Sequence, residues 1–179
     1  MKKHSGMRPL DVVVLMKLVA LQLENTKKPW TLREIAQSLF LSASEVSESL
    51  NRSSIAGLLD GSKKQIQALN LLDFLQYGLK YVFPQQPGAY QRGMPTAHSA
   101  PMFKDALVSS ETYVWPEPFG QTSGFVIEPL YPTIPKACRE DEQLWALMAL
   151  VEMLRVGKTR EVKFAVTHLK DFLKYAKSQ

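Results

Sequence analysis

Side chains that can hydrogen-bond to nucleic-acid bases share one face of a helix predicted over residues 43–55. At about 100° per residue, this face lies opposite Ala43, Val46 and Leu50. It carries Ser44, Ser47, Glu48, Asn51 and Arg52. Asn pairs bidentately with adenine and Arg with guanine, Ser suits several base edges, and Glu accepts a hydrogen bond from cytosine. The pattern predicts contact with base edges in the major groove, and a solvated helix surface is the alternative interpretation.

Two capping boxes mark the helices that would position this face. Thr31-Leu32-Arg33-Glu34 and Ser42-Ala43-Ser44-Glu45 each place a hydroxyl three residues before a Glu, which is the pattern of a helix N-terminus. Apolar residues recur at helical spacing after the first box, and the second helix is predicted to end near Ile55. Two short helices about three residues apart predict a helix-turn-helix. A largely buried helix is predicted before it, over residues 9–24.

Residues 30–60 resemble the winged helix-turn-helix of bacterial transcriptional regulators of the MarR-like type. The resemblance is carried by Leu32-Arg33-Glu34-Ile35-Ala36, Leu41-Ser42-Ala43-Ser44-Glu45-Val46 and Ala56-Gly57-Leu58-Leu59. Phe40 departs from it at a turn position that such proteins often fill with Gly, and Ser53 departs from it at a usually apolar position. The resemblance implies binding to double-stranded DNA. A plain helical hairpin that does not bind DNA is the alternative.

A short wing is predicted after this motif, because Asp60-Gly61 is a hairpin signal. Lys63 and Lys64 then stand where a wing contacts phosphate, and Arg33, with Lys27-Lys28, would flank the same backbone. Contacts of this kind add affinity without reading sequence. A role in solubility is the alternative for each of these cations. The next helix, over residues 67–80, is apolar almost all round and is predicted to be either an internal hub or a dimer helix.

A proline-rich segment, with short strands predicted at 81–84, 112–116 and 124–129, contains a second group of reactive side chains. These are Arg92, Thr96, His98 and Ser99. His98 and Ser99 are adjacent, without a glycine elbow or a third member, so no catalytic residue is predicted and the chain is not expected to be an enzyme. The three histidines are scattered and no phosphate-binding glycine loop occurs, so neither a metal nor a cofactor is predicted. We expect these residues either to stabilise the loop or to bind a small-molecule effector or a protein partner.

Two apolar helices are predicted at the end of the chain, the first capped by Asp141 and running to about Val156. The second has apolar residues at helical spacing opposite a face of lysines interrupted by Glu161 and Asp171. We expect a homodimer, formed through these helices or through the helix at 67–80. Such a dimer would present two recognition helices to a palindromic site.

The composition is that of a globular protein, with 179 residues, 45% of them hydrophobic and 22% charged. The absence of a long apolar run, and of a signal-peptide pattern, predicts a cytoplasmic chain without membrane contact. Cys138 is the single cysteine and excludes an internal disulfide. Nine of the eleven prolines lie between 84 and 135, which separates two basic regions.

The sequence therefore predicts a mainly α protein with a small β component. Three regions are expected: a winged helix-turn-helix over 1–80, a proline-rich sensing or docking region over 81–135, and a C-terminal helical hairpin over 136–179. The expected function is sequence-specific transcriptional regulation, with repression as the simpler mechanism. The alternative is a protein-interaction module or antitoxin-like partner that uses the winged helix for protein contact.

Overall fold

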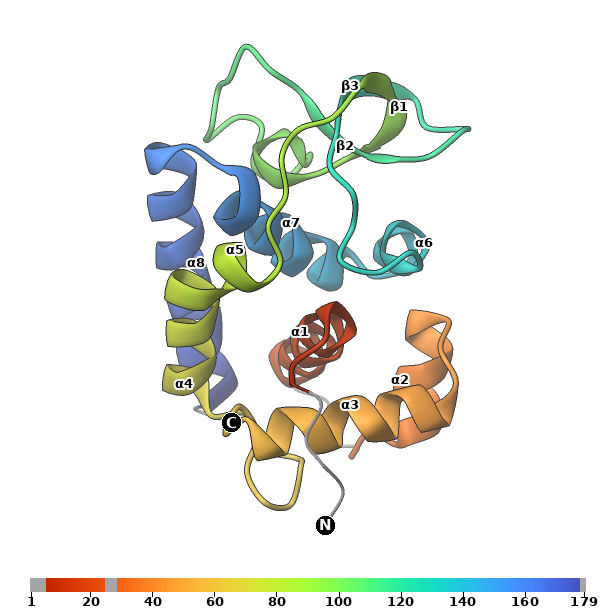
Figure 1. The fold of residues 1–179 in the computed structure, drawn as a ribbon, viewed down its shortest axis with the longest axis vertical. Coiled ribbons are helices and arrows are strands. Elements are labelled where there is room, and N and C mark those ends of the chain that lie inside the picture. The colour runs from red at the N-terminus through yellow and green to blue at the C-terminus, as the bar shows by residue number, and fades with distance from the viewer. Residues whose placement is uncertain (1–5, 25–28, 178–179) are drawn as a thin grey trace.

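The structure is a computed structural model that describes residues 6–24 and 29–177. It is mainly helical with a small sheet (Figure 1), which confirms the predicted class. In chain order the elements are α1 (Pro9–Leu23), α2 (Leu32–Leu39), α3 (Ala43–Ile55), α4 (Ala68–Asp73), the π-helical turn η1 (Phe74–Gly78), α5 (Leu79–Val82), β1 (Tyr90–Pro95), the 3-10 turn η2 (Ala97–Ser99), β2 (Tyr113–Pro116), β3 (Thr122–Val126), α6 (Ile134–Glu140), α7 (Glu142–Val156) and α8 (Thr159–Lys177).

Helix α1 runs through the middle of the molecule, where α2, α3, α7 and α8 pack against it (Figure 1). Every residue from Leu10 to Ala20 is buried, as expected for a helix that is apolar on all sides. Two of these buried residues are charged. Lys17 Nζ donates a hydrogen bond of 2.6 Å to Asp141 Oδ2 at the start of α7, and Asp11 pairs with α3. Both ion pairs therefore join α1 to a neighbouring helix.

The sheet is small and closed, because β1 pairs antiparallel with both β2 and β3, and these two pair in parallel. Gly93 permits the close approach of β1 to β2, since a Cβ at this position would lie 2.0 Å from the carbonyl oxygen of Trp115. The strands predicted at 112–116 and 124–129 correspond to β2 and β3 with shifted ends. The strand predicted at 81–84 is wrong, because residues 79–82 form α5 and β1 begins only at Tyr90.

The predicted helix at 67–80 is nearly continuous in the structure but contains the π-helical turn η1. Its inner side buries Leu71, Leu75 and Leu79 against the core, which continues the helix through Tyr81-Val82 despite their preference for strands. The opposite side is open to solvent, although a helix that is apolar almost all round was expected to be buried on most sides. We call it the α4–α5 face; it comprises Leu69, Tyr77, Tyr81 and Val82.

One hydrophobic core runs through the described part of the chain. It contains Leu15 of α1, Trp115 of β2, Leu150 of α7 and Leu169 of α8. All three predicted regions contribute to this core, and their division into separate domains stays a prediction. Asp141 caps α7 as predicted, with its Oδ1 accepting a hydrogen bond of 2.9 Å from the Leu144 amide. Within the described residues, no helix has the length and apolar character needed to cross a bilayer.

Candidate nucleic-acid interface

Both predicted capping boxes form and fix the starts of α2 and α3. Thr31 Oγ1 accepts from the Glu34 amide at 3.2 Å, while Glu34 Oε2 accepts from the Thr31 amide at 2.8 Å. Ser42 and Glu45 repeat this exchange at 3.2 and 2.8 Å. Each box satisfies two backbone donors that a helix start otherwise leaves unpaired. The two helices are therefore held at defined ends, as the sequence predicts.

Phe40 forms the turn between these helices in a left-handed conformation, with φ of 56°. The Leu41 amide donates to the Ala36 carbonyl at 2.8 Å and the Phe40 amide to the Gln37 carbonyl at 3.2 Å, the pattern of a Schellman ending. This conformation costs a non-glycine residue about 1–2 kcal/mol. The half-buried Phe40 ring packs against the core and lies 3.8 Å below Lys136 Nζ, contacts that a glycine could not make.

The outer face of α3 exposes Ser44, Ser47, Glu48 and Asn51, where the helical periodicity places them. Ala43 is exposed as well, so its predicted inward position is wrong. The buried side of the helix instead consists of Val46, Ser49, Leu50, Arg52 and Ser53. The departure at Ser53 from the winged-helix pattern is thus a buried serine, and its carbonyl oxygen accepts a hydrogen bond from the Leu58 amide at 2.9 Å.

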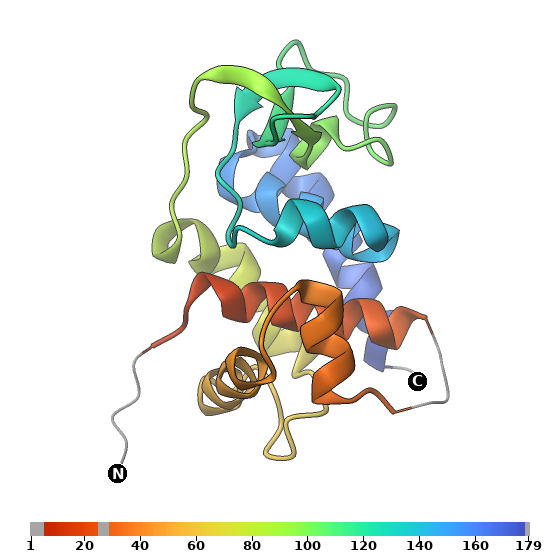
Figure 2. The same cartoon turned by 90° about the vertical axis from the view of Figure 1, so that its right-hand side faces the viewer.

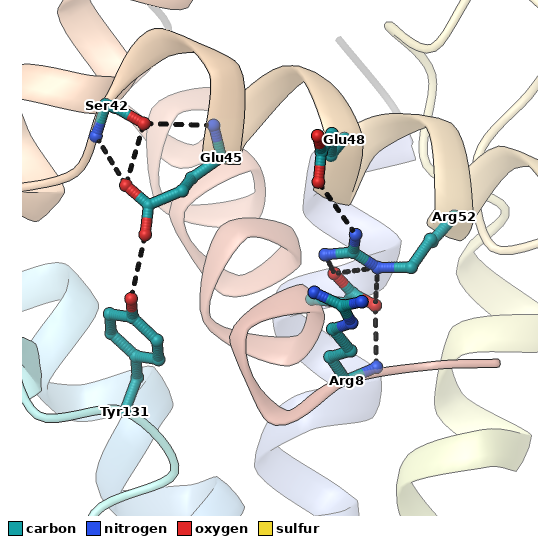
Figure 3. Close-up of polar contacts among 7 residues, drawn as sticks. Arg8, Ser42, Glu45, Glu48, Arg52 and Tyr131 are labelled. Atoms are coloured by element: carbon teal, nitrogen blue, oxygen red, sulfur yellow. Dashed lines mark hydrogen bonds and ion pairs between the residues drawn. The ribbon is translucent and has the colours of Figure 1, made fainter. Parts of the chain in front are cut away.

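Arg52 does not lie on the outer face, and its predicted outward position is wrong. Its side chain turns back against the start of α1 (Figure 3), where Nη2 lies 2.7 Å from Asp11 Oδ1 and Nε lies 3.0 Å from Asp11 Oδ2. The residue is 7% exposed. The hydrogen bonds to Asp11 raise the pKa of Arg52 above its ordinary value. Arg52 sits a quarter turn from the centre of the exposed face, and its long stem reaches the buried carboxylate, which requires a partner.

Two further charged residues surround this ion pair. Glu48 Oε2 lies 3.7 Å from Arg52 Nη1 on the solvent side. Arg8 donates its backbone amide to Asp11 Oδ2 at 2.8 Å and carries an exposed side chain beside the pair (Figure 3). Arg8 was not among the residues predicted from the sequence for this region. Pro9 stands at the first turn of α1, and this preference of proline could have placed Arg8 at the start of the helix.

Tyr131 anchors the start of α3 to the segment that precedes α6 (Figure 3). Its hydroxyl donates a hydrogen bond of 2.9 Å to Glu45 Oε1. The backbone amide and hydroxyl of Ser42, followed by the Tyr131 hydroxyl, lower the pKa of Glu45. Glu45 therefore stays on its own helix cap as an ionised group and is engaged within the protein rather than available to a ligand.

The predicted wing is a short hairpin that projects from the molecule beside α3 (Figure 2). Leu59 and Ile66 form its single bridge within the described chain. Asp60 holds the turn: its Oδ2 accepts from the Ser62 hydroxyl at 2.6 Å, and its Oδ1 accepts from the Lys64 and Gln65 amides at 3.1 and 3.0 Å. The left-handed residue is Lys63, with φ of 62°, although the dipeptide Asp60-Gly61 predicted a turn at the glycine. Lys64 is exposed and Lys63 half-buried.

The cations and anions of this region are equal in number, but they differ in which of them point outward. Residues 31–67 contain four cations and four anions. Glu34, Glu45 and Asp60 hydrogen-bond to amides of their own turns, and Arg52 is buried. The outward charges are therefore the cations Arg33, Lys63 and Lys64 and the anion Glu48. Lys27 and Lys28, which we predicted to flank the same surface, lie outside the described residues.

The second predicted group, in the proline-rich segment, is not brought together as one cluster. Thr96 and His98 are buried, and His98 Nε2 lies 2.7 Å from the Glu111 carbonyl oxygen. Ser99 Oγ accepts a hydrogen bond of 2.9 Å from the Tyr113 amide. Arg92 is exposed on β1. His98 and Ser99 line a cavity that Arg92 and Thr96 do not line. Among the described residues, no group of three His, Cys, Asp or Glu side chains could hold a metal ion.

Comparison with family models, with curated proteins and with solved structures finds no match for this chain. The resemblance to winged-helix regulators rests on the sequence of residues 30–60 alone. Its functional implication is therefore a proposal.

Proposed function

We propose that the protein is a sequence-specific DNA-binding transcriptional regulator of the winged helix-turn-helix type. The observation that carries this proposal is the position of α3 beside the hairpin (Figure 2), together with the exposure of Ser44, Ser47 and Asn51 on α3 and of Lys64 on the hairpin. A recognition helix reads base edges in the major groove while neighbouring cations contact phosphates. The fixed caps of α2 and α3 and the carboxylate-braced turn at Asp60 provide a rigid arrangement for such contacts.

The exposed residues divide into two roles under this proposal. Ser44, Ser47 and Asn51 contact base edges, and Asn51 has the amide that pairs with adenine. Glu48 accepts a hydrogen bond from cytosine. Its exposed carboxylate has one ion-pair partner among the described residues, Arg52, whose Nη1 lies 3.7 Å away. Arg33, Lys63 and Lys64 contact phosphates, which sets affinity and register without reading sequence. Arg52 has no place in the contact surface, and it positions α3 on α1 instead.

A homodimer completes the proposal, and the α4–α5 face is its contact surface. The other predicted dimer helices bury their apolar residues inside the protomer, including Leu144, Leu150 and Leu169. By contrast, Leu69 is 73% exposed and Tyr81 is 74% exposed. An exposed apolar patch of this kind marks an interaction site. In the proposed mechanism, a cytoplasmic dimer covers a palindromic promoter site and represses transcription, with no catalytic step, metal or cofactor.

Capture of fragmented genomic DNA by the purified protein, followed by sequencing, tests this proposal. We expect one enriched motif for the parent protein. Asn51→Ala should lose that enrichment, whereas Gln143→Ala, which removes an exposed side-chain amide from α7, should keep it. Uniform recovery of all fragments by the parent, or equal enrichment by both variants, would contradict the assignment of α3 as the reading helix.

The second candidate function is a protein-interaction module, and the balance of four cations and four anions over residues 31–67 favours it. DNA-binding surfaces are usually strongly positive. Under this candidate, α3 and the wing contact a partner protein, for example a toxin-like one. Affinity purification of the full chain, run beside the DNA capture, separates the candidates: a stoichiometric protein bound through Asn51 and Lys64, without an enriched DNA motif, would favour the interaction module.

A further inference from the structure

A cavity of about 400 Å³ lies between the sheet and the segment that joins η2 to β2. Its volume is within the range of roughly 300–1,000 Å³ that is typical of small-molecule sites. Pro95, Pro101, Leu107 and Val108 provide an apolar wall. The Pro95 carbonyl oxygen accepts a hydrogen bond of 3.0 Å from Trp145 Nε1 on α7. The wall is therefore fixed to the core, which reduces the entropy lost when a ligand binds.

Hydroxyl groups line the other side of this cavity. Ser99 Oγ accepts from the Tyr113 amide, and Ser109 Oγ accepts from the Glu111 amide at 3.3 Å. Each serine hydroxyl retains its own proton as a donor, because a hydroxyl both donates and accepts. Thr112 and Thr122 also line the cavity. The cavity is therefore rich in donors suited to a ligand with acceptor oxygens.

The lining contains one cation, Lys104, and one anion, Glu111. Glu111 is already engaged, since its Oε2 lies 3.3 Å from Lys158 Nζ and 3.3 Å from the Tyr113 hydroxyl. Lys104 is exposed at the cavity, and within the described part of the chain its ammonium group has no ion-pair partner. An ammonium group beside hydroxyl donors suits a carboxylate, because hydrogen bonds to a charged group are the stronger ones.

From these observations we infer that the cavity binds a small organic carboxylate. The carboxylate lies at Lys104 and the serine and threonine hydroxyls, while the apolar part of the ligand packs against Pro95, Pro101 and Leu107. This binding requires no DNA, so it stands or falls separately from the proposed function.

Benzoate is the probe for this inference, and amide NMR spectra of the full chain report where it binds. Benzamide has the same shape without the charge, and inorganic phosphate has charge without the apolar ring. We expect saturable shifts from benzoate, confined to residues 95–112 and Thr122, with a Kd of about 1 mM or lower. Benzamide and phosphate should each bind about tenfold more weakly or not at all.

Two variants and a control locate the contacts. Lys104→Met should weaken benzoate binding by about tenfold, the effect of losing one charge-assisted hydrogen bond, and Thr122→Val should weaken it by a smaller factor. Lys170→Met removes an exposed lysine of α8 and should leave binding unchanged. The inference is overturned by absent or scattered shifts, by benzamide or phosphate binding as tightly as benzoate, or by parent-like affinity in Lys104→Met.

Discussion

Arg52 and Asp11 are separated by 41 residues in the sequence, yet they form a buried bidentate ion pair between α3 and α1, with N–O distances of 2.7 and 3.0 Å. This pair attaches the proposed reading helix to α1, in which every residue from Leu10 to Ala20 is buried. The Lys17–Asp141 pair attaches the same helix α1 to α7. The orientation of α3 is therefore set by the core and not by the helix-turn-helix alone.

Breaking this ion pair should destabilise the whole protein. Asp11→Asn retains the shape of the side chain but leaves the buried Arg52 guanidinium with only the exposed Glu48 carboxylate, 3.7 Å from Nη1, as a counter-charge. Loss of the buried partner costs about 3–5 kcal/mol. Denaturant unfolding followed by circular dichroism measures the change. The matched control is Asp171→Asn on α8, whose carboxylate is 60% exposed and whose loss should change the free energy of unfolding by less than about 0.5 kcal/mol. Similar stabilities for the two variants would show that the pair does not hold α3 in place.

The wing turn should resist acid because of the low pKa of Asp60. Hydrogen bonds from the Ser62 hydroxyl and the Gln65 amide lower this pKa to about 2 from an ordinary value of 3.8. A carboxyl with a lowered pKa stabilises the folded turn fully above its ordinary pKa, and this contribution is lost as pH falls toward the folded value. The amide NMR shifts of Lys64 and Gln65 should therefore stay constant as pH falls through 3.8. A titration step centred on that ordinary value would show that Asp60 is not held in these bonds.

The features predicted correctly from the sequence depend on residues that are close together in the chain. The caps at Thr31, Ser42 and Asp141 each involve a residue and an amide three positions later, so spacing alone identifies them. The exposed face of α3 follows from periodicity in the same way. The turn at Phe40 was located as a departure from the glycine common there, and its left-handed backbone agrees with that position.

The errors arose where a distant residue decides the structure. Arg52 is inward because Asp11 is buried in α1 and requires a cation. An acid within an apolar run was the sequence signal for this pair, but it does not identify which cation is the partner. Residues 81–84 are not a strand because packing of Leu79 extends the helix. The cavity at Lys104 joins residues from 95 to 122, and no short spacing indicates it.

Disruption of the α4–α5 face should convert the proposed dimer into a monomer. Tyr77→Glu places a charge in an apolar contact, which a dimer interface tolerates poorly. Sedimentation at micromolar concentration should give twice the 20.2 kDa mass for the parent and the single mass for the variant. Phe119→Glu, which changes a 94% exposed aromatic residue outside this face, is the control and should remain dimeric. A monomeric parent would exclude paired recognition of two half-sites.

Reading of DNA by α3 is the central claim, and the affinity of Asn51→Ala for the enriched DNA site tests it most directly. The comparison is made at one salt concentration, with Gln143→Ala as the control and with both variants shown to unfold like the parent. Loss of a bidentate base contact should cost about 1–3 kcal/mol, which is about 5-fold to 150-fold in affinity. We predict that loss for Asn51→Ala and none for Gln143→Ala. Parent-like affinity in a folded Asn51→Ala protein would contradict it.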